Sequence, residues 1–254
     1  MHMEQVLRQM REMRLSRMAD ALEERLRKGD HRDLSHEEFL AVLVEDEYTA
    51  RKGRKLSRAI GRANFRSEQA CIENLRYSPT RGLSKKDVAP YTSKSWIDNC
   101  QNVVITGPTG TGKTYVAEAI GLRACTMGYS VLKIRYRKLL DDIATARGTG
   151  TYAKFVTSIE KTKVLIIDDF VISPADKKQC SDLLELLEDR EQRGPLMITS
   201  QYAVDEWHGR FADPTVADAI CDRLVHTAHR IELGGGSMRR ATETAEKQPS
   251  KCPI

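Results

Sequence analysis

The 254-residue sequence predicts an α/β protein in which helices cover a five-stranded parallel sheet and a small helical module precedes it. Two observations support this prediction. Short apolar runs alternate with helical patterns from residue 101 onward, and the first run leads directly into a glycine-rich motif. Runs that are apolar on both faces and separated by helices are typical of parallel strands buried between two helical layers.

The expected strands lie at 102–107, 130–135, 163–168, 195–200 and 228–233. Helical patterns fill the gaps at about 113–127, 137–147, 176–193 and 215–226. We therefore expect the sheet domain to span residues 101–240. The polar segment 241–254 is expected to be a disordered tail, because it has too few apolar residues to form a core.

The first 66 residues are highly charged and carry a helical period. Between Leu7 and Leu26, apolar residues recur at three- and four-residue steps, which predicts one amphipathic helix. A second helix is expected after Ser35, which begins a capping-box pattern. Residues 1–66 are thus predicted to form a helical module, and residues 67–100 an irregular connector with a short helix near "SKSWIDNC".

The composition limits the class of protein. Hydrophobic residues make up 40% of the chain and charged residues 30%, which is an ordinary balance for a soluble protein. No apolar run reaches the roughly 18 residues of a membrane span, and the N-terminus lacks the apolar core of a signal peptide. We therefore expect a cytoplasmic protein with no membrane partner. The six cysteines are scattered, which argues against a zinc site or a disulfide framework.

The second expected helix carries a stretch of one charge sign. Residues 51–66 contain seven Lys or Arg and no Asp or Glu, although the net charge of the whole chain is only +5. Many of these residues recur at three- and four-residue steps, so they form a basic stripe along one helix face. One interpretation is a solvated surface; the other is a site for the backbone of double-stranded DNA. The predicted DNA-binding residues are Arg51, Arg54, Lys55, Arg58 and Arg62.

The segment "GPTGTGKT" matches the phosphate-loop pattern G-x-x-x-x-G-K-[ST] in full. It lies between the first expected strand and a helix, so that backbone N–H groups and the helix N-terminus close around phosphates. Lys113 is expected to reach the β- and γ-phosphates, and the Thr114 hydroxyl to bind Mg²⁺. The predicted nucleotide contacts here are Gly107, Pro108, Thr109, Gly110, Thr111, Gly112, Lys113, Thr114 and Tyr115.

Two adjacent carboxylates end the apolar run "KVLIIDDF". In phosphate-loop proteins a later strand ends in an aspartate that helps to hold Mg²⁺, and Asp168 fits that role. Successive strand residues point to opposite faces, so Asp169 need not share the same task. We predict that Asp169 orients or deprotonates the attacking water. A plain capping pair at the strand end is the alternative.

The combination of motifs resembles a known family. The phosphate loop and "VLIIDDF" are followed by "MITSQ", "TVADAICDRLVH" and "RIELGGGSMRR", an order that resembles the IstB/DnaC branch of the AAA+ ATPases. The segment "REMRLSRMADALEE" also resembles the start of IstB proteins, so the likeness covers about residues 4–240. It implies the AAA+ fold, ATP and Mg²⁺ as cofactors, and a homo-oligomer with nucleotide at the subunit junctions.

The resemblance also implies a sensor-1 segment that senses the γ-phosphate. Thr199, Ser200 and Gln201 match this segment at the end of the fourth strand. Ser200 and Gln201 are the predicted nucleotide contacts, and which of the three residues senses the phosphate stays open. Most AAA+ proteins have Glu where this chain has Asp169, and the shorter side chain suggests slower hydrolysis.

Two arginines complete the implied site. Arg223 in "CDRL" matches the arginine finger, which reaches the nucleotide of the neighbouring subunit. Arg239 in "GSMR" matches sensor 2, with Arg240 as a substitute, and each arginine has a surface ion pair as its alternative interpretation. The predicted catalytic residues are therefore Lys113, Asp169 and Arg223.

The implied function is that of an ATP-hydrolysing, DNA-binding regulator of transposition. It would assemble on target DNA and recruit or stimulate a partner transposase. One alternative is a helicase loader of the DnaC type, in which the N-terminal module docks a helicase. Another is a metabolic phosphate-loop kinase, which would leave Arg223 and the basic stripe unexplained.

Overall fold

The computed structural model describes residues 2–30, 33–67 and 70–238. Contacts divide the chain into two compact units, Met1–Arg58 and Ala59–Ile254. Arg239, Arg240 and the expected tail 241–254 lie outside the described residues. Helix α3 (His36–Arg62) runs without a break across the division at Arg58, so the expected module boundary at residue 66 stays a prediction.

The N-terminal unit begins with two helices where the sequence predicted one. Helix α1 (Met3–Glu12) and helix α2 (Ser16–Lys28) are separated by a turn in which Arg14 has a left-handed backbone with φ 62°. Leu7, Met10 and Ala19 form the buried core between them. The single-helix prediction was wrong because the apolar period continues through the turn and gives no sign of the break.

The start of α3 confirms the capping box. The Ser35 amide donates to the Glu38 carboxylate at 2.8 Å, and the Glu38 amide donates to the Ser35 hydroxyl at 3.2 Å. Further along, Glu47 is only 4% exposed and accepts hydrogen bonds from the Met18 amide and the Arg51 guanidinium. This carboxylate ties α3 to the start of α2.

The second unit contains the predicted parallel sheet of five strands. Their order is β2-β3-β4-β1-β5, and every neighbouring pair is parallel. The central strands are buried along their whole length, as continuous apolar runs predict. The strands are β1 (Val103–Thr106), β2 (Val131–Arg135), β3 (Val164–Asp168), β4 (Leu196–Ser200) and β5 (His229–Glu232).

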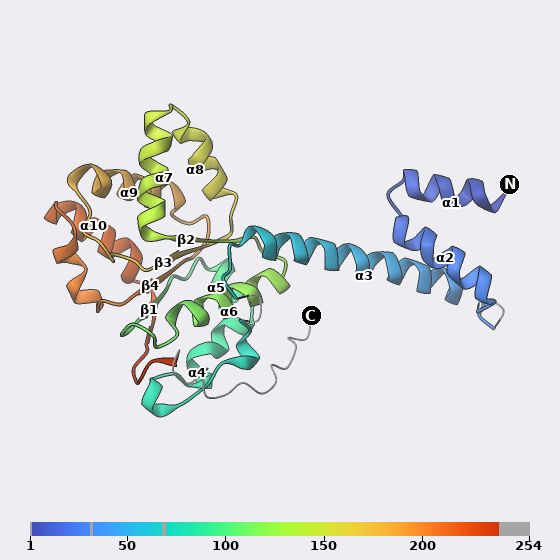
Figure 1. Ribbon diagram of the computed structural model, residues 1–254, viewed down its shortest axis with the longest axis horizontal. Coiled ribbons are helices and arrows are strands. Elements are labelled where there is room, and N and C mark those ends of the chain that lie inside the picture. The colour runs from blue at the N-terminus through green and yellow to red at the C-terminus, as the bar shows by residue number, and fades with distance from the viewer. Residues whose placement is uncertain (1, 31–32, 68–69, 239–254) are drawn as a thin grey trace. The chain divides into compact units, whose positions relative to one another are not determined.

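Helices cover both faces of the sheet (Figure 1). Helix α6 (Lys113–Thr126) packs on one face so closely that a Cβ atom on Gly121 would lie 2.9 Å from Ile166 and from Phe65. Four helices cover the other face around the main core: α7 (Tyr136–Gly148), α8 (Tyr152–Glu160), α9 (Lys177–Arg190) and α10 (Pro214–Val225). Helix α8 was not expected from the sequence. No described helix has the length and apolar character needed to cross a membrane.

The segment expected as a connector packs against the sheet domain. Its helices are η1 (Ile72–Asn74), η2 (Pro79–Arg81), α4 (Lys85–Val88), η3 (Ala89–Thr92) and α5 (Ser95–Asp98). Helix α5 is the short helix predicted near "SKSWIDNC". Leu83, Tyr91 and Trp96 are almost completely buried, so this segment contributes to the hydrophobic core of the second unit.

The sheet register brings the candidate residues to one edge. Thr106 is level with Ser200, and Ile167 is level with Ile198, so the carboxyl ends of β1, β3 and β4 lie side by side. Ligand sites in open parallel sheets lie at this edge. The phosphate loop, Asp168 and the end of β4 therefore converge through strand pairing alone.

A buried ion pair anchors the chain segment that leads from α3 into the sheet domain. Glu118 on α6 is 1% exposed and pairs with Lys133 on β2, which is 5% exposed. Glu118 also accepts hydrogen bonds from the backbone N–H groups of Arg66 and Ser67, at 2.9 and 3.1 Å. Lys133 is therefore a structural cation.

Replacing Glu118 with Ala is expected to destabilise the protein by about 3–5 kcal/mol, because Lys133 is left as an unpaired buried charge. Urea unfolding followed by circular dichroism measures this loss. The matched control is Asp142→Ala, which removes the carboxylate of an exposed pair with Lys138 and should cost less than about 1 kcal/mol. Equal losses in the two variants would contradict the structural role of Glu118.

Candidate functional site

The phosphate loop joins β1 to α6 and depends on three glycines. Gly107, Gly110 and Gly112 have φ values of 139°, 90° and 89°, which side-chain-bearing residues rarely adopt. A Cβ atom on Gly107 would also lie 2.0 Å from the Leu233 carbonyl oxygen. Both backbone conformation and close packing therefore require glycine in this loop.

Lys113 occupies the interior of the loop as the first residue of α6. Its side chain is 7% exposed, and Nζ donates to the carbonyl oxygens of Gly107 at 2.7 Å and Pro108 at 2.9 Å. The ammonium group is thus held where the loop curves around it. This arrangement places a positive charge beside the loop's backbone N–H groups, which is the chemistry that binds a polyphosphate.

Asp168 lies at the end of β3 with no solvent exposure. Its Oδ1 atom accepts hydrogen bonds from the Thr114 hydroxyl at 2.8 Å and the Thr199 hydroxyl at 2.6 Å. Its Oδ2 atom is buried and accepts no hydrogen bond within the described part of the chain. A buried carboxylate oxygen without a donor is costly, and a bound cation removes that cost.

These oxygens fit Mg²⁺, which prefers a few carboxylate and hydroxyl ligands together with phosphate oxygens. Thr114 and Asp168 are the predicted metal ligands, and the structure brings their oxygens into contact. Their donor set is therefore compatible with the metal.

Asp169 follows the end of β3, where the chain turns sharply. Its backbone is left-handed with φ 57°, and its amide donates to the Thr199 hydroxyl at 3.1 Å. Burial, and secondarily the nearby Asp168 charge, raises the pKa of the Asp169 carboxyl. A raised pKa makes Asp169 a stronger base than an exposed aspartate, which suits removal of a proton from water. The two carboxylates thus occupy different environments.

An aromatic cluster supports this turn. Phe170 is fully buried and contacts the rings of Tyr136 and Trp207 at centroid distances of 5.0 and 4.9 Å. The Phe170 amide donates to the Thr199 carbonyl at 2.7 Å, while the Ser200 hydroxyl donates to the Phe170 carbonyl at 3.0 Å. The strained turn is therefore held by both packing and hydrogen bonds.

The three sensor-1 candidates have different surroundings. Thr199 contacts Asp168 and the Asp169 amide, as described above. The Ser200 hydroxyl donates to the Phe170 carbonyl in the turn after β3. The Gln201 side chain accepts a hydrogen bond from the Thr109 hydroxyl in the phosphate loop at 2.8 Å. Tyr115 lies close enough to Arg81 for the two side chains to interact electrostatically. Thr199 is the residue that the predicted contact set omitted.

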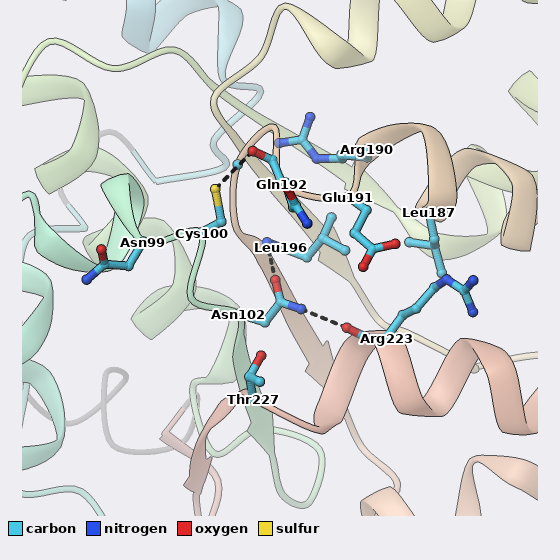
Figure 2. A pocket seen from close by; sticks show the side chains of 11 residues that line it. Asn99, Cys100, Asn102, Leu187, Arg190, Glu191, Gln192, Leu196, Arg223 and Thr227 are labelled. Carbon is cyan, nitrogen blue, oxygen red and sulfur yellow. Dashed lines mark hydrogen bonds between the residues drawn. The ribbon is translucent and has the colours of Figure 1, made fainter.

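Arg223 lies away from the phosphate loop. It lines a pocket of about 220 Å³ at the other edge of the sheet, where the Asn102 side chain bridges the Arg223 carbonyl and the Leu196 amide (Figure 2). Its Nη2 atom pairs with Glu188 at 2.7 Å, and its Nε atom is buried without a partner in the described residues. Asn102 lies just before β1, and Gly107, the first residue of the phosphate loop, lies just after it. At a rise of about 3.3 Å per residue, these two residues are about 16 Å apart.

The predicted basic residues lie on α3. Arg51 and Arg54 are about half exposed and both pair with Glu47, at 2.7 and 3.2 Å. Lys55, Arg58 and Arg62 are exposed, and no ion pair involves them among the described residues. Sequence reasoning also missed Arg81, a buried arginine that contacts the phosphate loop through the Thr111 carbonyl. No local pattern marks it.

The phosphate loop, the five-stranded order and the acidic end of β3 together define a protein with the AAA+ phosphate-loop fold. The chain belongs to the family of IstB-like ATP binding proteins, whose sequence model matches residues 8–246.

Relatives from two organisms support this assignment. The chain is 42% identical to an insertion sequence ATP-binding protein, y4pL, of Sinorhizobium fredii, over 90% of this chain and 93% of the relative. It is 34% identical to the ATP-binding protein Rv3427c in an insertion sequence of Mycobacterium tuberculosis, over 91% and 92% of the two chains.

Solved structures share the fold. AMPPCP-bound DnaA from Aquifex aeolicus has a TM-score of 0.58 at 18% identity, covering 71% of this chain and 56% of DnaA. The DnaC helicase loader has a TM-score of 0.54 at 14% identity, covering 65% of this chain and 97% of the loader structure. At these identities the similarity concerns the AAA+ fold alone.

Replacing Lys113 with Ala is expected to remove detectable ATP binding, because the loop loses the cation that balances the phosphate charge. Isothermal titration calorimetry measures the affinity. Lys154→Ala, which removes an exposed lysine of α8, is the matched control and should bind ATP normally. Normal affinity in the Lys113 variant would refute the nucleotide site.

Proposed function

We propose that this chain is an ATP-hydrolysing, DNA-binding regulator of transposition. It assembles on target DNA and recruits or stimulates a partner transposase. The observation that supports this best is the contact of Thr114 and Thr199 with Asp168 beside the phosphate loop, in a chain of the IstB-like family. The names of its relatives link them to ATP and to insertion sequences.

The separate environments of the two carboxylates support ATP hydrolysis. Asp168 and Thr114 would hold Mg²⁺, which neutralises charge on the phosphates when bound. Asp169, with its raised pKa, accepts the proton of the attacking water. Thr199 contacts both the Asp168 carboxylate and the Asp169 amide, and so fixes their relative positions.

The position of Arg223 supports assembly into an oligomer. About 16 Å of strand separates its end of the sheet from the phosphate loop of the same chain, so it is suited to act on a neighbouring subunit. Its ion pair with Glu188 is partly exposed, and such pairs are weak enough to exchange for a phosphate. We infer a homo-oligomer in which Arg223 completes the nucleotide site of the next subunit. An arginine in this role stabilises charge in the transition state.

DNA binding is assigned to the basic stripe on α3. Lys55, Arg58 and Arg62 carry most of it, because Arg51 and Arg54 already neutralise the buried Glu47 carboxylate. Exposed cations on one helix contact phosphates without reading bases, which suits a protein that acts on many target sequences. The solvated-face interpretation predicts no effect of the stripe on DNA affinity.

A helicase loader is the second candidate, favoured by the similarity of the sheet domain to almost the whole DnaC structure. In that case the assembly would require a helicase instead of duplex DNA. The family assignment and the stripe favour the transposition regulator.

The Asp169→Asn variant should bind ATP and assemble on duplex DNA but lose ATP turnover by about 100-fold or more, since the water loses its base. Phosphate release measures turnover, and size-exclusion chromatography with light scattering measures assembly. Wild-type assemblies should decay as ATP is consumed, whereas those of the variant should persist.

The control is Asp141→Asn, which makes the same change at an exposed position on α7. Undiminished turnover in the Asp169 variant would refute its role, and assembly that needs a helicase would favour the loader.

Replacing Lys55, Arg58 and Arg62 with Ala should weaken DNA binding equally for unrelated sequences. The slope of log affinity against log salt should fall by about 3, because three phosphate contacts are lost. Fluorescence anisotropy over a salt series measures both quantities. The control removes the same charge from exposed positions outside the stripe: Arg8, Arg17 and Arg27 to Ala. If both triple variants lose affinity equally, only net charge matters and the stripe is not the site.

A further inference from the structure

Arg81, at the end of η2, is a buried arginine directed at the outer side of the phosphate loop. Its side chain is 7% exposed. Nε and Nη2 both donate to the Thr111 carbonyl, at 3.2 and 3.1 Å, and Nη1 donates to the Arg76 carbonyl at 2.7 Å. All three guanidinium nitrogens therefore contact backbone carbonyl groups.

The backbone around Arg81 is fixed independently of the loop. The Arg81 amide donates to the Ser78 carbonyl at 3.0 Å, and the Arg81 carbonyl accepts from the Gly234 amide at 2.8 Å. Gly82 packs so tightly on the end of β5 that a Cβ atom there would lie 2.4 Å from the Glu232 carbonyl oxygen. The guanidinium is thus anchored to the sheet, and the loop is held against it.

The charge of Arg81 is not balanced by a carboxylate in the described residues, where its contacts are the carbonyls named above. Burial, and secondarily repulsion from Arg76, lowers the pKa of Arg81. A buried cation without an anion is unfavourable. An anion bound on the other side of the loop would offset that cost.

The geometry of the peptide bond extends the effect of Arg81 through the loop. A trans peptide is planar, so its C=O and N–H groups point in opposite directions. Because the Thr111 carbonyl faces Arg81, the N–H of Gly112 faces away from the guanidinium. Gly112 also fits against the guanidinium only as glycine, since a Cβ atom would lie 2.7 Å from Arg81 Nη2.

We propose that Arg81 is a positioning residue for phosphate binding. It orients the Thr111–Gly112 peptide so that the Gly112 N–H faces a nucleotide phosphate, and it places a second positive charge behind the loop, in addition to Lys113. The inference rests on the proposed binding of ATP. It assigns to the segment before β1 a part in nucleotide affinity that its sequence did not indicate.

Arg81→Met tests this role because Met keeps much of the side-chain length without charge or donors. The N–H contact exists in both ground and transition states, so KM for ATP should rise at least tenfold while kcat changes less than about twofold. Calorimetry should show the same loss of affinity for ATP and ADP. Arg81→Lys, which restores the charge but not the planar fork, should recover part of the affinity.

The control is Arg137→Met, the same change at an exposed arginine on α7, which should alter neither constant. Damage to the fold alone would lower kcat through loss of active protein and leave KM unchanged, and that result would overturn the proposal. Unchanged affinity in Arg81→Met would also overturn it. Failure of the wild-type protein to bind ATP would instead refute the proposed function, so the two failures are distinguishable.

Discussion

The candidate site depends on one buried carboxylate and the two hydroxyl groups that hold it. Asp168 is fully buried at the end of β3. Its carboxylate accepts hydrogen bonds from the hydroxyl groups of Thr114 on α6 and Thr199 on β4. A slip of one residue in the pairing of β3 with β4 would turn Asp168 and Thr199 to opposite faces of the sheet. The register that buries the apolar strands is therefore the same register that assembles the polar site, and neither can change without the other.

Much of the fold could be predicted because its signals are local. The five strands, the phosphate loop and the two carboxylates each occupy a short segment whose residue types suffice to identify it. Two polar residues, Thr199 and Ser200, end β4, and Gln201 follows directly. The alternation of side chains alone does not show which of the three faces Asp168, so the role of Thr199 was left undecided. The role of Arg81 could not be predicted, because its contact with the phosphate loop is made with Thr111, 30 positions away in the sequence.

Charged residues were the hardest to interpret from the sequence. Lys133 and Glu118 are typical surface residues by composition, yet each is almost completely buried because the other is its partner. Arg51 and Arg54 looked equivalent to the other residues of the stripe, but the buried Glu47 engages both of them. Counting charges along a helix overestimates the charge that remains available to a ligand when an acidic residue one or two turns away is buried beside them.

The bonds made by Glu118 have a mechanical consequence. Glu118 lies five residues after Lys113 on α6, and it binds the backbone of Arg66 and Ser67, just beyond the end of α3. The Lys133 amide also donates to the Ala63 carbonyl at 2.8 Å, which adds a second anchor on β2. A flexible linker transmits a displacement only when it is fully extended. Residues 63–67 are instead hydrogen-bonded to both α6 and β2. A displacement or rotation of these residues is therefore transmitted directly to the helix that begins at the phosphate loop.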